Sequence, residues 1–243
     1  PVIIHESDMT PGLANRIAIP KATIVCHNFP ETSAYLPKGK SVLTGSPIRE
    51  ELRHGNKLAG LDLCGFTTNK PVVMVVGGSL GAKAINDAVR DALPELLKTY
   101  QIVHLCGKGK VDDTLNDIEG YKQFEYIKEE MKDLFAMSDL IVSRAGANAI
   151  CEIQALCKPN ILIPLPASAS RGDQILNAAS FERQGFSKVV PEENVTTKNL
   201  IDTIHDVYNN RAKYIENMQN AKTSDAVSTI IGLIEDIVNK KSE

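Results

Sequence analysis

Two short glycine-containing segments carry the residue types that bind phosphate. Residues 77–81 read Gly-Gly-Ser-Leu-Gly after the apolar run 72–76, and residues 144–146 read Arg-Ala-Gly after the apolar run 139–143. Glycine lets backbone N–H groups approach a ligand closely, and the unpaired N–H groups of a helix N-terminus attract phosphate. Each segment is therefore a candidate phosphate cradle. For each, the alternative is a tight strand-to-helix turn that needs glycine only for its dihedral angles.

A carboxylate follows the second segment at a useful distance. Arg144, Gly146 and the next backbone amides can cradle a pyrophosphate, and Glu152 lies about two turns further along the predicted helix. A carboxylate there can accept both ribose hydroxyls of a nucleotide whose phosphates sit at the helix N-terminus. The alternative is an ordinary solvated glutamate, and the pair of glycine turns favours the nucleotide interpretation.

A third segment, residues 168–178, places polar side chains at the start of another predicted helix. Helix capping is enough to explain Asp173. Gln174 in the first turn can donate hydrogen bonds to sugar hydroxyls, although the spacing alone does not separate that role from a structural one.

A dinucleotide-dependent dehydrogenase is the rival from another reaction class. Its fingerprint is G-x-G-x-x-G with an acidic residue about 20 positions further on. This sequence has G-G-x-x-G, and the next strand runs into Leu105-Cys106-Gly107 without a carboxylate. The pattern therefore disfavours hydride transfer.

The elements that must position these residues alternate between strand and helix. Several β-branched runs are continuously apolar, which is typical of strands buried on both faces of a parallel sheet. The predicted strands are 2–4, 23–26, 41–44, 71–76, 101–105, 123–127, 139–143, 160–163 and 187–190, and the predicted helices are 82–98, 128–137, 146–157, 173–184, 197–209, 211–221 and 226–240. This order predicts an α/β fold with a doubly wound parallel sheet, which binds its ligand beyond the carboxyl ends of the strands.

Composition places the chain among ordinary globular proteins. Of its 243 residues 43% are hydrophobic and 23% charged, with a formal net charge of -3, which disfavours disorder and a dedicated nucleic-acid binder. No run approaches the ~18 apolar residues of a membrane span. The five cysteines lack metal-binding spacing, and we interpret them as reduced thiols.

The chain divides at the Gly-Ser-Pro segment near residues 44–49, after which 54–70 reads as a polar, irregular stretch. Residues 1–43 hold too few elements for a core of their own, and the strand-like run at the very start suggests that the sequence opens inside a domain. We expect 1–43 to be the end of a preceding domain and 44–225 to be a nucleotide-binding domain. We expect 226–243 to form a closing helix that crosses back towards the first domain and leaves part of its apolar face bare.

Five segments in this order resemble the MurG family of bacterial N-acetylglucosaminyltransferases: HESDMTPGLANR (5–16), TGSPIRE (44–50), GGSLGAKAIN (77–86), SRAGANAICEI (143–153) and ASRGDQILNA (169–178). The resemblance extends from residue 1 to about 225. It implies the GT-B architecture of two Rossmann-like domains facing a cleft. It also implies transfer of N-acetylglucosamine from UDP-N-acetylglucosamine to lipid I, making lipid II with inversion and with no cofactor or protein-bound metal.

The resemblance assigns roles to matching positions of this chain. Arg49 and Ser79 match contacts to the donor diphosphate, Ile127 the position whose backbone reads the uracil edge, and Gln174 the glutamine bound to the sugar. The segment that matches the phosphate and ribose contacts, with Glu152 as the ribose acceptor, is Ala147, Asn148, Ala149, Ile150, Cys151 and Glu152.

The first domain's cleft edge is matched by His5, Glu6, Asp8 and Asn15, where Ser7-Asp8 replaces the Gln-Asn of many relatives. Inverting transfer needs a base for the acceptor hydroxyl. The resemblance places its histidine in a glycine-rich loop that has no counterpart in these 243 residues, which leaves His5 and Glu6 as substitutes. We expect the chain to bind donor but not to turn over lipid I.

The family lies on the cytoplasmic face of the bacterial membrane, attached through an apolar patch on its first domain. The resemblance therefore implies an anionic membrane surface and lipid I as partners, and no nucleic acid. Two other functions remain open. One is an enzyme resembling UDP-N-acetylglucosamine 2-epimerase, and the other is a sugar-nucleotide-binding module without turnover.

Overall fold

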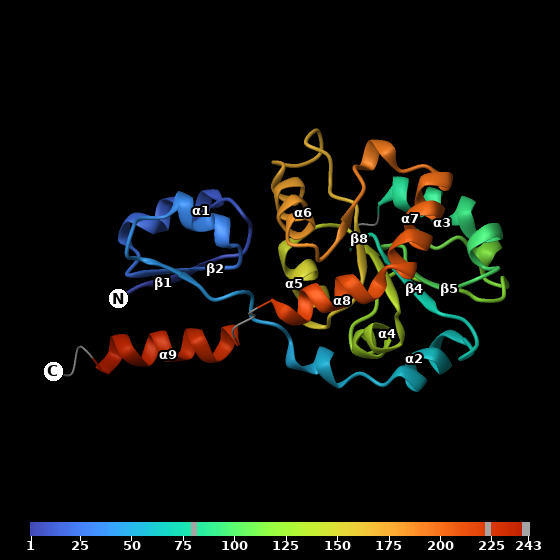
Figure 1. Cartoon of the computed structure of the whole chain (residues 1–243), viewed down its shortest axis with the longest axis horizontal. Helices are drawn as coiled ribbons and strands as arrows, with labels where there is room; N and C mark the ends of the chain where they lie inside the picture. Colours follow the sequence, from blue (N-terminus) through green and yellow to red (C-terminus); the bar gives the residue numbers. More distant parts are fainter. Residues whose placement is uncertain (79–81, 222–224, 240–243) are drawn as a thin grey trace.

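The computed structural model describes residues 1–78, 82–221 and 225–239, and it places two parallel β-sheets side by side along the long axis of the molecule (Figure 1). The smaller sheet has the order β1-β2-β3 and the larger the order β6-β5-β4-β7-β8-β9. We call the parts built on them the small unit (residues 1–43) and the large unit (residues 44–221).

The small unit is a three-stranded sheet with a thin core. Its strands are β1 (Ile3–Glu6), β2 (Ile24–His27) and β3 (Ser41–Leu43), joined by α1 (Leu13–Ala18) and by short 3-10 helices at Ile19–Lys21 and Pro30–Tyr35. Ala22, Val25 and Leu36 are its clustered buried apolar side chains. So few buried side chains supply little hydrophobic free energy, as the sequence indicated for this segment.

All neighbouring strands of the larger sheet pair in parallel. The strands are β4 (Val72–Val76), β5 (Gln101–Leu105), β6 (Tyr121–Phe124), β7 (Leu140–Ser143), β8 (Asn160–Leu162) and β9 (Lys188–Val189). The chain runs outward from β4 to β6 and then returns to the other side of β4 for β7 to β9. The strand order therefore reverses between β4 and β7, which is where such sheets bind ligands.

Successive side chains of β4 point to opposite faces of the sheet. Val73 and Val75 pack in one core cluster, and Val72 and Met74 in another. Because both faces are covered, the strand reads as the continuously apolar run VVMVV instead of alternating. The doubly wound α/β sheet predicted from the sequence is confirmed.

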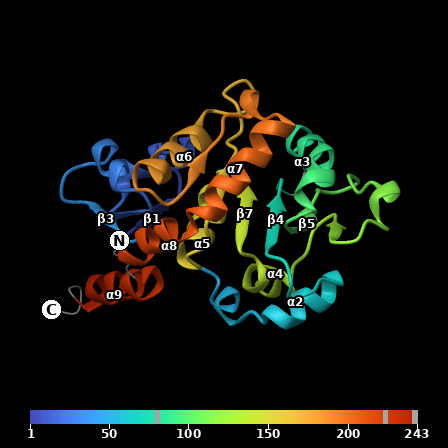
Figure 2. The same ribbon diagram turned by 45° about the vertical axis from the view of Figure 1, so that its right-hand side comes forward.

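The helices form one layer on each face (Figure 2). Buried side chains of α3 (Lys83–Leu96) and α7 (Thr197–Asn209) join the Val73 cluster, and those of α2 (Lys57–Cys64) and α4 (Met131–Met137) join the Met74 cluster. A third cluster forms where α5 (Ala147–Ala155), α6 (Asp173–Arg183) and α8 (Arg211–Asn220) meet Phe29 of the small unit.

The prediction that residues 54–70 are irregular is wrong, because this stretch contains α2. The side chain of Asn56 caps α2 by accepting from the backbone N–H groups of Leu58 and Ala59, and Gly65 ends it in the left-handed region at φ 66°. At Gly60 a Cβ would lie 2.5 Å from the carbonyl oxygen of Asp133. The helix therefore packs on α4 through a glycine, which leaves no apolar stripe in the sequence.

Helix α9 (Ala226–Asn239) extends away from the large unit and lies beside the small sheet in both views (Figures 1 and 2). Ile231 and Ile234 are 50% and 47% exposed, so part of its apolar face is bare, as expected.

Within the described residues, no helix combines the length and apolarity needed to cross a membrane. The division of the chain at residues 43 and 225 into domains stays a prediction.

Candidate functional site

The two glycine turns that the sequence singled out meet at the β4/β7 reversal. Val76 of β4 pairs with Ser143 of β7, so the residues that follow these strands leave the sheet at the same edge. A side chain at Gly77 would be crowded, since a Cβ would lie 3.0 Å from the backbone nitrogen of Ala82. Gly78 adopts φ +88°, a conformation that favours glycine. Ser79, the predicted diphosphate contact, lies outside the described residues.

Among the described residues, neither helix that follows these turns has a side-chain cap. The N-cap positions of α3 and α5 are Ala82 and Gly146, and no side-chain hydrogen bond is made at either. The first backbone N–H groups of both helices therefore lack the partner that Ser, Thr or Asp usually supplies. With the positive ends of two helix dipoles at one sheet edge, the arrangement suits a diphosphate.

Arg49 and Glu152, which are 103 residues apart in the sequence, form a two-point ion pair. The Nε of Arg49 lies 2.9 Å from one carboxylate oxygen of Glu152, and its Nη2 lies 3.3 Å from the other. The hydrogen bond that Arg49 donates to Glu152 raises the pKa of Arg49 above its usual range. The structure thus brings together the residues expected at the diphosphate and at the ribose, and the carboxylate carries a positive partner.

Gln174 fastens the first turn of α6 to the turns after β7 and β8. Its side-chain oxygen accepts from the backbone N–H groups of Ala145, at 3.2 Å, and Leu165, at 3.1 Å. In the described part of the chain its side-chain nitrogen makes no hydrogen bond, so that NH₂ group is the one available to a sugar.

Arg144 is directed into the protein instead of toward a phosphate. Its guanidinium donates to the carbonyl oxygens of Ile163, at 3.1 Å, and Pro164, at 3.3 Å, and it pairs with the carboxylate of Glu192. These contacts tie the turn after β7 to the end of β8.

Ile127 lies beyond the end of β6, and its side chain packs against the cluster around Met74. Its backbone N–H and C=O make no hydrogen bond within the described residues. A partly buried side chain with an unpaired backbone suits the predicted reading of a base edge. Cys151 on α5 is buried, and burial raises its pKa to about 12, so this thiol packs and stays protonated.

Of the residues expected at the cleft edge, His5, Glu6 and Asn15 are engaged within the small unit or its connection, and Asp8 accepts from Asn177 of the large unit. Glu6 accepts from the backbone N–H groups of Asp8, at 3.0 Å, and Gly12, at 2.9 Å, and from the side chain of Asn15, at 2.8 Å. Nε2 of His5 lies 3.0 Å from the carbonyl oxygen of Gly45 and donates to it. Both side chains hold backbone in place.

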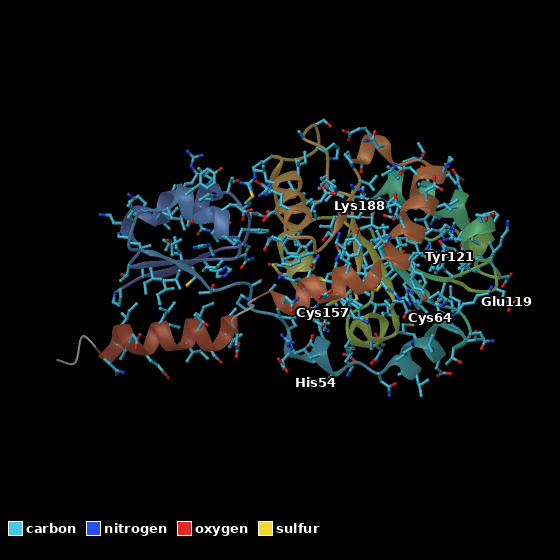
Figure 3. All side chains as sticks on the ribbon, viewed as in Figure 1. His54, Cys64, Glu119, Tyr121, Cys157 and Lys188 are labelled. Atoms are coloured by element: carbon cyan, nitrogen blue, oxygen red, sulfur yellow. The ribbon has the colours of Figure 1, made fainter. Side chains whose placement is uncertain are left out.

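A buried polar chain behind the first glycine turn was not anticipated, although its first residue ends the quoted motif GGSLGAKAIN. The Asn86 amide donates to the carbonyl oxygen of Cys106 at 2.9 Å, and its oxygen lies 3.0 Å from Nε2 of His104. Nδ1 of His104 lies 2.9 Å from the hydroxyl of Tyr121, which is labelled in Figure 3. Burial lowers the pKa of His104 to about 3, so the ring is neutral and accepts from Tyr121. This series of hydrogen bonds from Asn86 to Tyr121 fixes the start of α3 against the end of β5.

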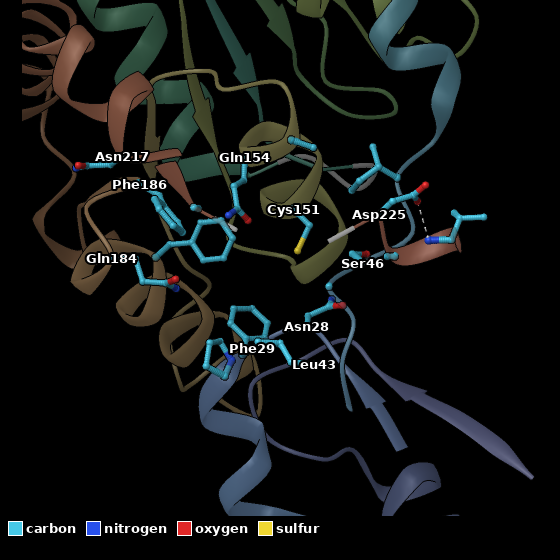
Figure 4. Close-up of a pocket in the computed structure, with 18 of the residues that line it drawn as sticks. Asn28, Phe29, Leu43, Ser46, Cys151, Gln154, Gln184, Phe186, Asn217 and Asp225 are labelled. Atoms are coloured by element: carbon cyan, nitrogen blue, oxygen red, sulfur yellow. Dashed lines mark hydrogen bonds between the residues drawn. The ribbon is translucent and has the colours of Figure 1, made fainter. Parts of the chain in front are cut away.

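A pocket of about 1140 Å³ lies between the two units, with residues of both in its lining (Figure 4). Phe29, Phe181 and Phe186 form an aromatic wall, with ring centroids 5.9 and 5.6 Å apart along the series. Of the predicted site residues that the structure describes, Cys151 alone lines it. The pocket therefore lies apart from the β4/β7 edge that holds the phosphate turns.

Comparison with known proteins agrees with this geometry. The model of the glycosyltransferase family 28 C-terminal domain matches residues 72–230. A curated protein of Lachnospira eligens is 63% identical over 236 residues, covering 97% of this chain and 67% of its own, and is named UDP-N-acetylglucosamine--N-acetylmuramyl-(pentapeptide) pyrophosphoryl-undecaprenol N-acetylglucosamine transferase. This chain belongs to the MurG family. A relative from Lachnoclostridium phytofermentans with the same name is 62% identical and is likewise matched over 67% of its length.

Solved structures confirm the GT-B fold class. The crystal structure of Acinetobacter baumannii MurG superposes with a TM-score of 0.74 at 27% identity, covering 97% of this chain and 67% of that one. A putative UDP-N-acetylglucosamine 2-epimerase from Listeria monocytogenes superposes with a TM-score of 0.66 at 14% identity, a likeness of fold alone. The chain spans about two thirds of the length of the MurG proteins it matches.

Proposed function

We propose that this chain supplies the donor side of an inverting transfer of N-acetylglucosamine from UDP-N-acetylglucosamine to lipid I, forming lipid II in peptidoglycan synthesis. The observation that carries the proposal is the pair of uncapped helix N-termini at the β4/β7 edge, in a chain 63% identical to an enzyme named for this reaction. Lipid I is the proposed acceptor, and the proposed place of action is the cytoplasmic face of an anionic membrane.

The proposed pose runs along the carboxyl edge of the sheet. The diphosphate lies at the N-termini of α3 and α5, with Ser79 and the 147–152 segment around it, and Arg49 nearby. The ribose hydroxyls reach Glu152, the uracil edge meets the backbone of Ile127, and the sugar meets the free NH₂ of Gln174. Because Arg49 already pairs with Glu152, ribose binding must share or replace that contact.

In the transfer, the acceptor hydroxyl oxygen forms a bond to the anomeric carbon as the bond from that carbon to the β-phosphate oxygen breaks. The hydroxyl proton goes to a base, and UDP leaves with the bonding electron pair. Helix N-termini aimed at the leaving phosphate stabilise the charge that it gathers. Because Glu6 already accepts three hydrogen bonds and His5 donates to Gly45, we assign both a structural role and not that of the base.

Calorimetry with UDP, UDP-N-acetylglucosamine and ADP tests the donor proposal. We expect both uridine nucleotides to bind and ADP not to bind, since the uracil contact is lost. Failure of UDP to bind would overturn the proposal. NMR of the sugar nucleotide after long incubation separates the epimerase, because an epimerase would produce UDP-N-acetylmannosamine and a transferase leaves the configuration at C2 unchanged.

A further inference from the structure

A single side-chain amide on α6 joins the small unit to the turn that opens α5. Asn177 is 0% exposed. Its oxygen accepts from the backbone N–H of Met9 at 3.0 Å, and its nitrogen lies 3.0 Å from the carboxylate of Asp8 and 3.3 Å from the carbonyl oxygen of Ala145. The side-chain oxygen of Asn177 therefore bonds the small unit, and its NH₂ group bonds both the small and the large unit.

Side chains of α6 bond both backbone polar groups of Ala145, its N–H and its C=O. Its N–H donates to Gln174 at 3.2 Å, and its carbonyl accepts from Asn177 at 3.3 Å. Gln174 and Asn177 are three residues apart and so lie on one face of the helix. Because Ala145 directly precedes Gly146, the N-cap of α5, these two amides determine where the uncapped N–H groups of α5 point.

A second link between the units lies one turn further along α6 and does not touch this turn. The carboxylate of Glu31 accepts from the hydroxyl of Ser180 at 2.9 Å and pairs with the guanidinium of Arg183, which donates to the same oxygen. This link docks the same two units without a contact to Ala145, and it therefore provides a matched comparison.

We propose that Asn177 is a positioning residue for donor binding: it couples the docking of the Asp8-Met9 segment to the placement of the Ala145 peptide at the phosphate turn. The inference rests on the proposed function, since it assumes that the start of α5 binds the donor diphosphate. Full burial keeps Asn177 itself from touching a ligand. Coupling of this kind is reciprocal, so the nucleotide should in turn hold the 8–9 segment more firmly.

The test compares UDP affinity and thermal stability in four forms of the 243-residue chain: wild type, Asn177→Ala, Asn177→Asp and Ser180→Ala. Loss of a buried hydrogen-bond partner predicts UDP binding weaker by about 10-fold in Asn177→Ala. Asn177→Asp keeps an acceptor for Met9 but cannot donate to Ala145, and it faces the Asp8 carboxylate, so we expect at least the same loss. If Asn177→Ala does not fold, Asn177→Asp gives the answer. Ser180→Ala should lower the melting temperature and leave the UDP Kd within about twofold of the wild-type value.

Hydrogen exchange supplies the readout that a purely structural role would not move. In the wild type, UDP should slow exchange in the peptide containing Met9, and in Asn177→Ala it should not. Wild-type UDP affinity in a folded Asn177 variant, measured well below its melting temperature, would overturn the inference and leave the proposed function standing. Equal losses in the Ser180 and Asn177 variants would overturn it as well, because general docking would then explain both. A wild-type chain that does not bind UDP would overturn the proposed function and, with it, this inference.

Discussion

Replacing Glu152 with alanine tests the assignment of the ribose site most directly. The proposed pose gives Glu152 the ribose hydroxyls, which UDP and UDP-N-acetylglucosamine share. Losing a charge-assisted hydrogen bond costs roughly 1.5–3 kcal/mol, or about 10- to 150-fold in affinity. We therefore expect both ligands to lose affinity by the same factor within that range.

The structure also predicts that folding stability changes little. The side chain of Arg49 is 48% exposed and that of Glu152 is 16% exposed, so water and salt screen much of their attraction. A half-exposed ion pair contributes about 0–1 kcal/mol. The free energy of unfolding should therefore fall by no more than about 1 kcal/mol, even though affinity falls by a larger amount.

Calorimetry with both ligands measures the affinity, and urea unfolding measures the stability. The matched control is Glu51→Ala. Glu51 also pairs with Arg49, at 3.7 Å, and its side chain is 65% exposed. If Glu51→Ala binds both nucleotides with unchanged affinity and Glu152→Ala binds both more weakly, the lost contact is the one between Glu152 and the ribose. Unchanged affinity for both ligands in Glu152→Ala would refute the assignment, and equal losses in the two variants would move the effect to Arg49.

Three further variants test other parts of the structure. Gln174→Glu keeps the oxygen that accepts from Ala145 and Leu165 but loses the free NH₂, so calorimetry should show near-normal UDP binding and a smaller preference for UDP-N-acetylglucosamine; equal losses for both ligands would reassign Gln174 to the turn alone. Gly60→Ala should lower the free energy of unfolding by roughly 1–3 kcal/mol in urea, because the new Cβ would lie 2.5 Å from the Asp133 carbonyl oxygen and overpack the contact with α4; an unchanged midpoint would contradict the packing. Burial holds the pKa of His104 near 3, below its value of about 6.5 in the unfolded chain. As pH falls, the unfolded chain therefore binds a proton first, and His104 should lower the free energy of unfolding by roughly 2–3 kcal/mol between pH 6.5 and 4.5. In His104→Gln the free energy of unfolding, measured in urea at each pH, should depend less steeply on pH.

The strands β4, β7 and β8 could be predicted because burial on both faces gives each a short apolar run. All nine predicted strands occur within the described residues, each within three residues of its expected start and end. The helix α2 was missed because Leu58 is 67% exposed while Gly60 makes the close contact with α4, so packing there does not follow the apolar pattern. A contact that depends on the absence of a side chain leaves no hydrophobic signal in the sequence.

The site was predictable as a set of residues but not as a set of contacts. Glycine followed by a helix indicates a phosphate turn from neighbouring residues alone, spacing along that helix indicated Glu152, and the resemblance supplied Arg49. Their ion pair spans 103 positions, and no spacing rule joins residues so far apart. The same holds for Asn177, whose partners Met9 and Ala145 lie on different units. Residue types indicate what a side chain can do, whereas the fold decides which group it reaches.

Neutral side-chain amides hold the turns around the proposed diphosphate site. Because an amide carries no net charge, it can fix these turns without changing the electrostatic potential that attracts the phosphate. Gln174 and Asn177 hold the peptide of Ala145, and Asn86 holds the carbonyl of Cys106 beyond β5. A side-chain amide can donate and accept at once, so it can satisfy both a backbone N–H and a C=O without adding charge. An unpaired guanidinium in the same place would compete with the helix N-termini for the bound diphosphate, which a neutral amide does not. The side chain of Arg144, the arginine that follows β7, is 12% exposed and is paired with Glu192, so its charge is already neutralised within the large unit.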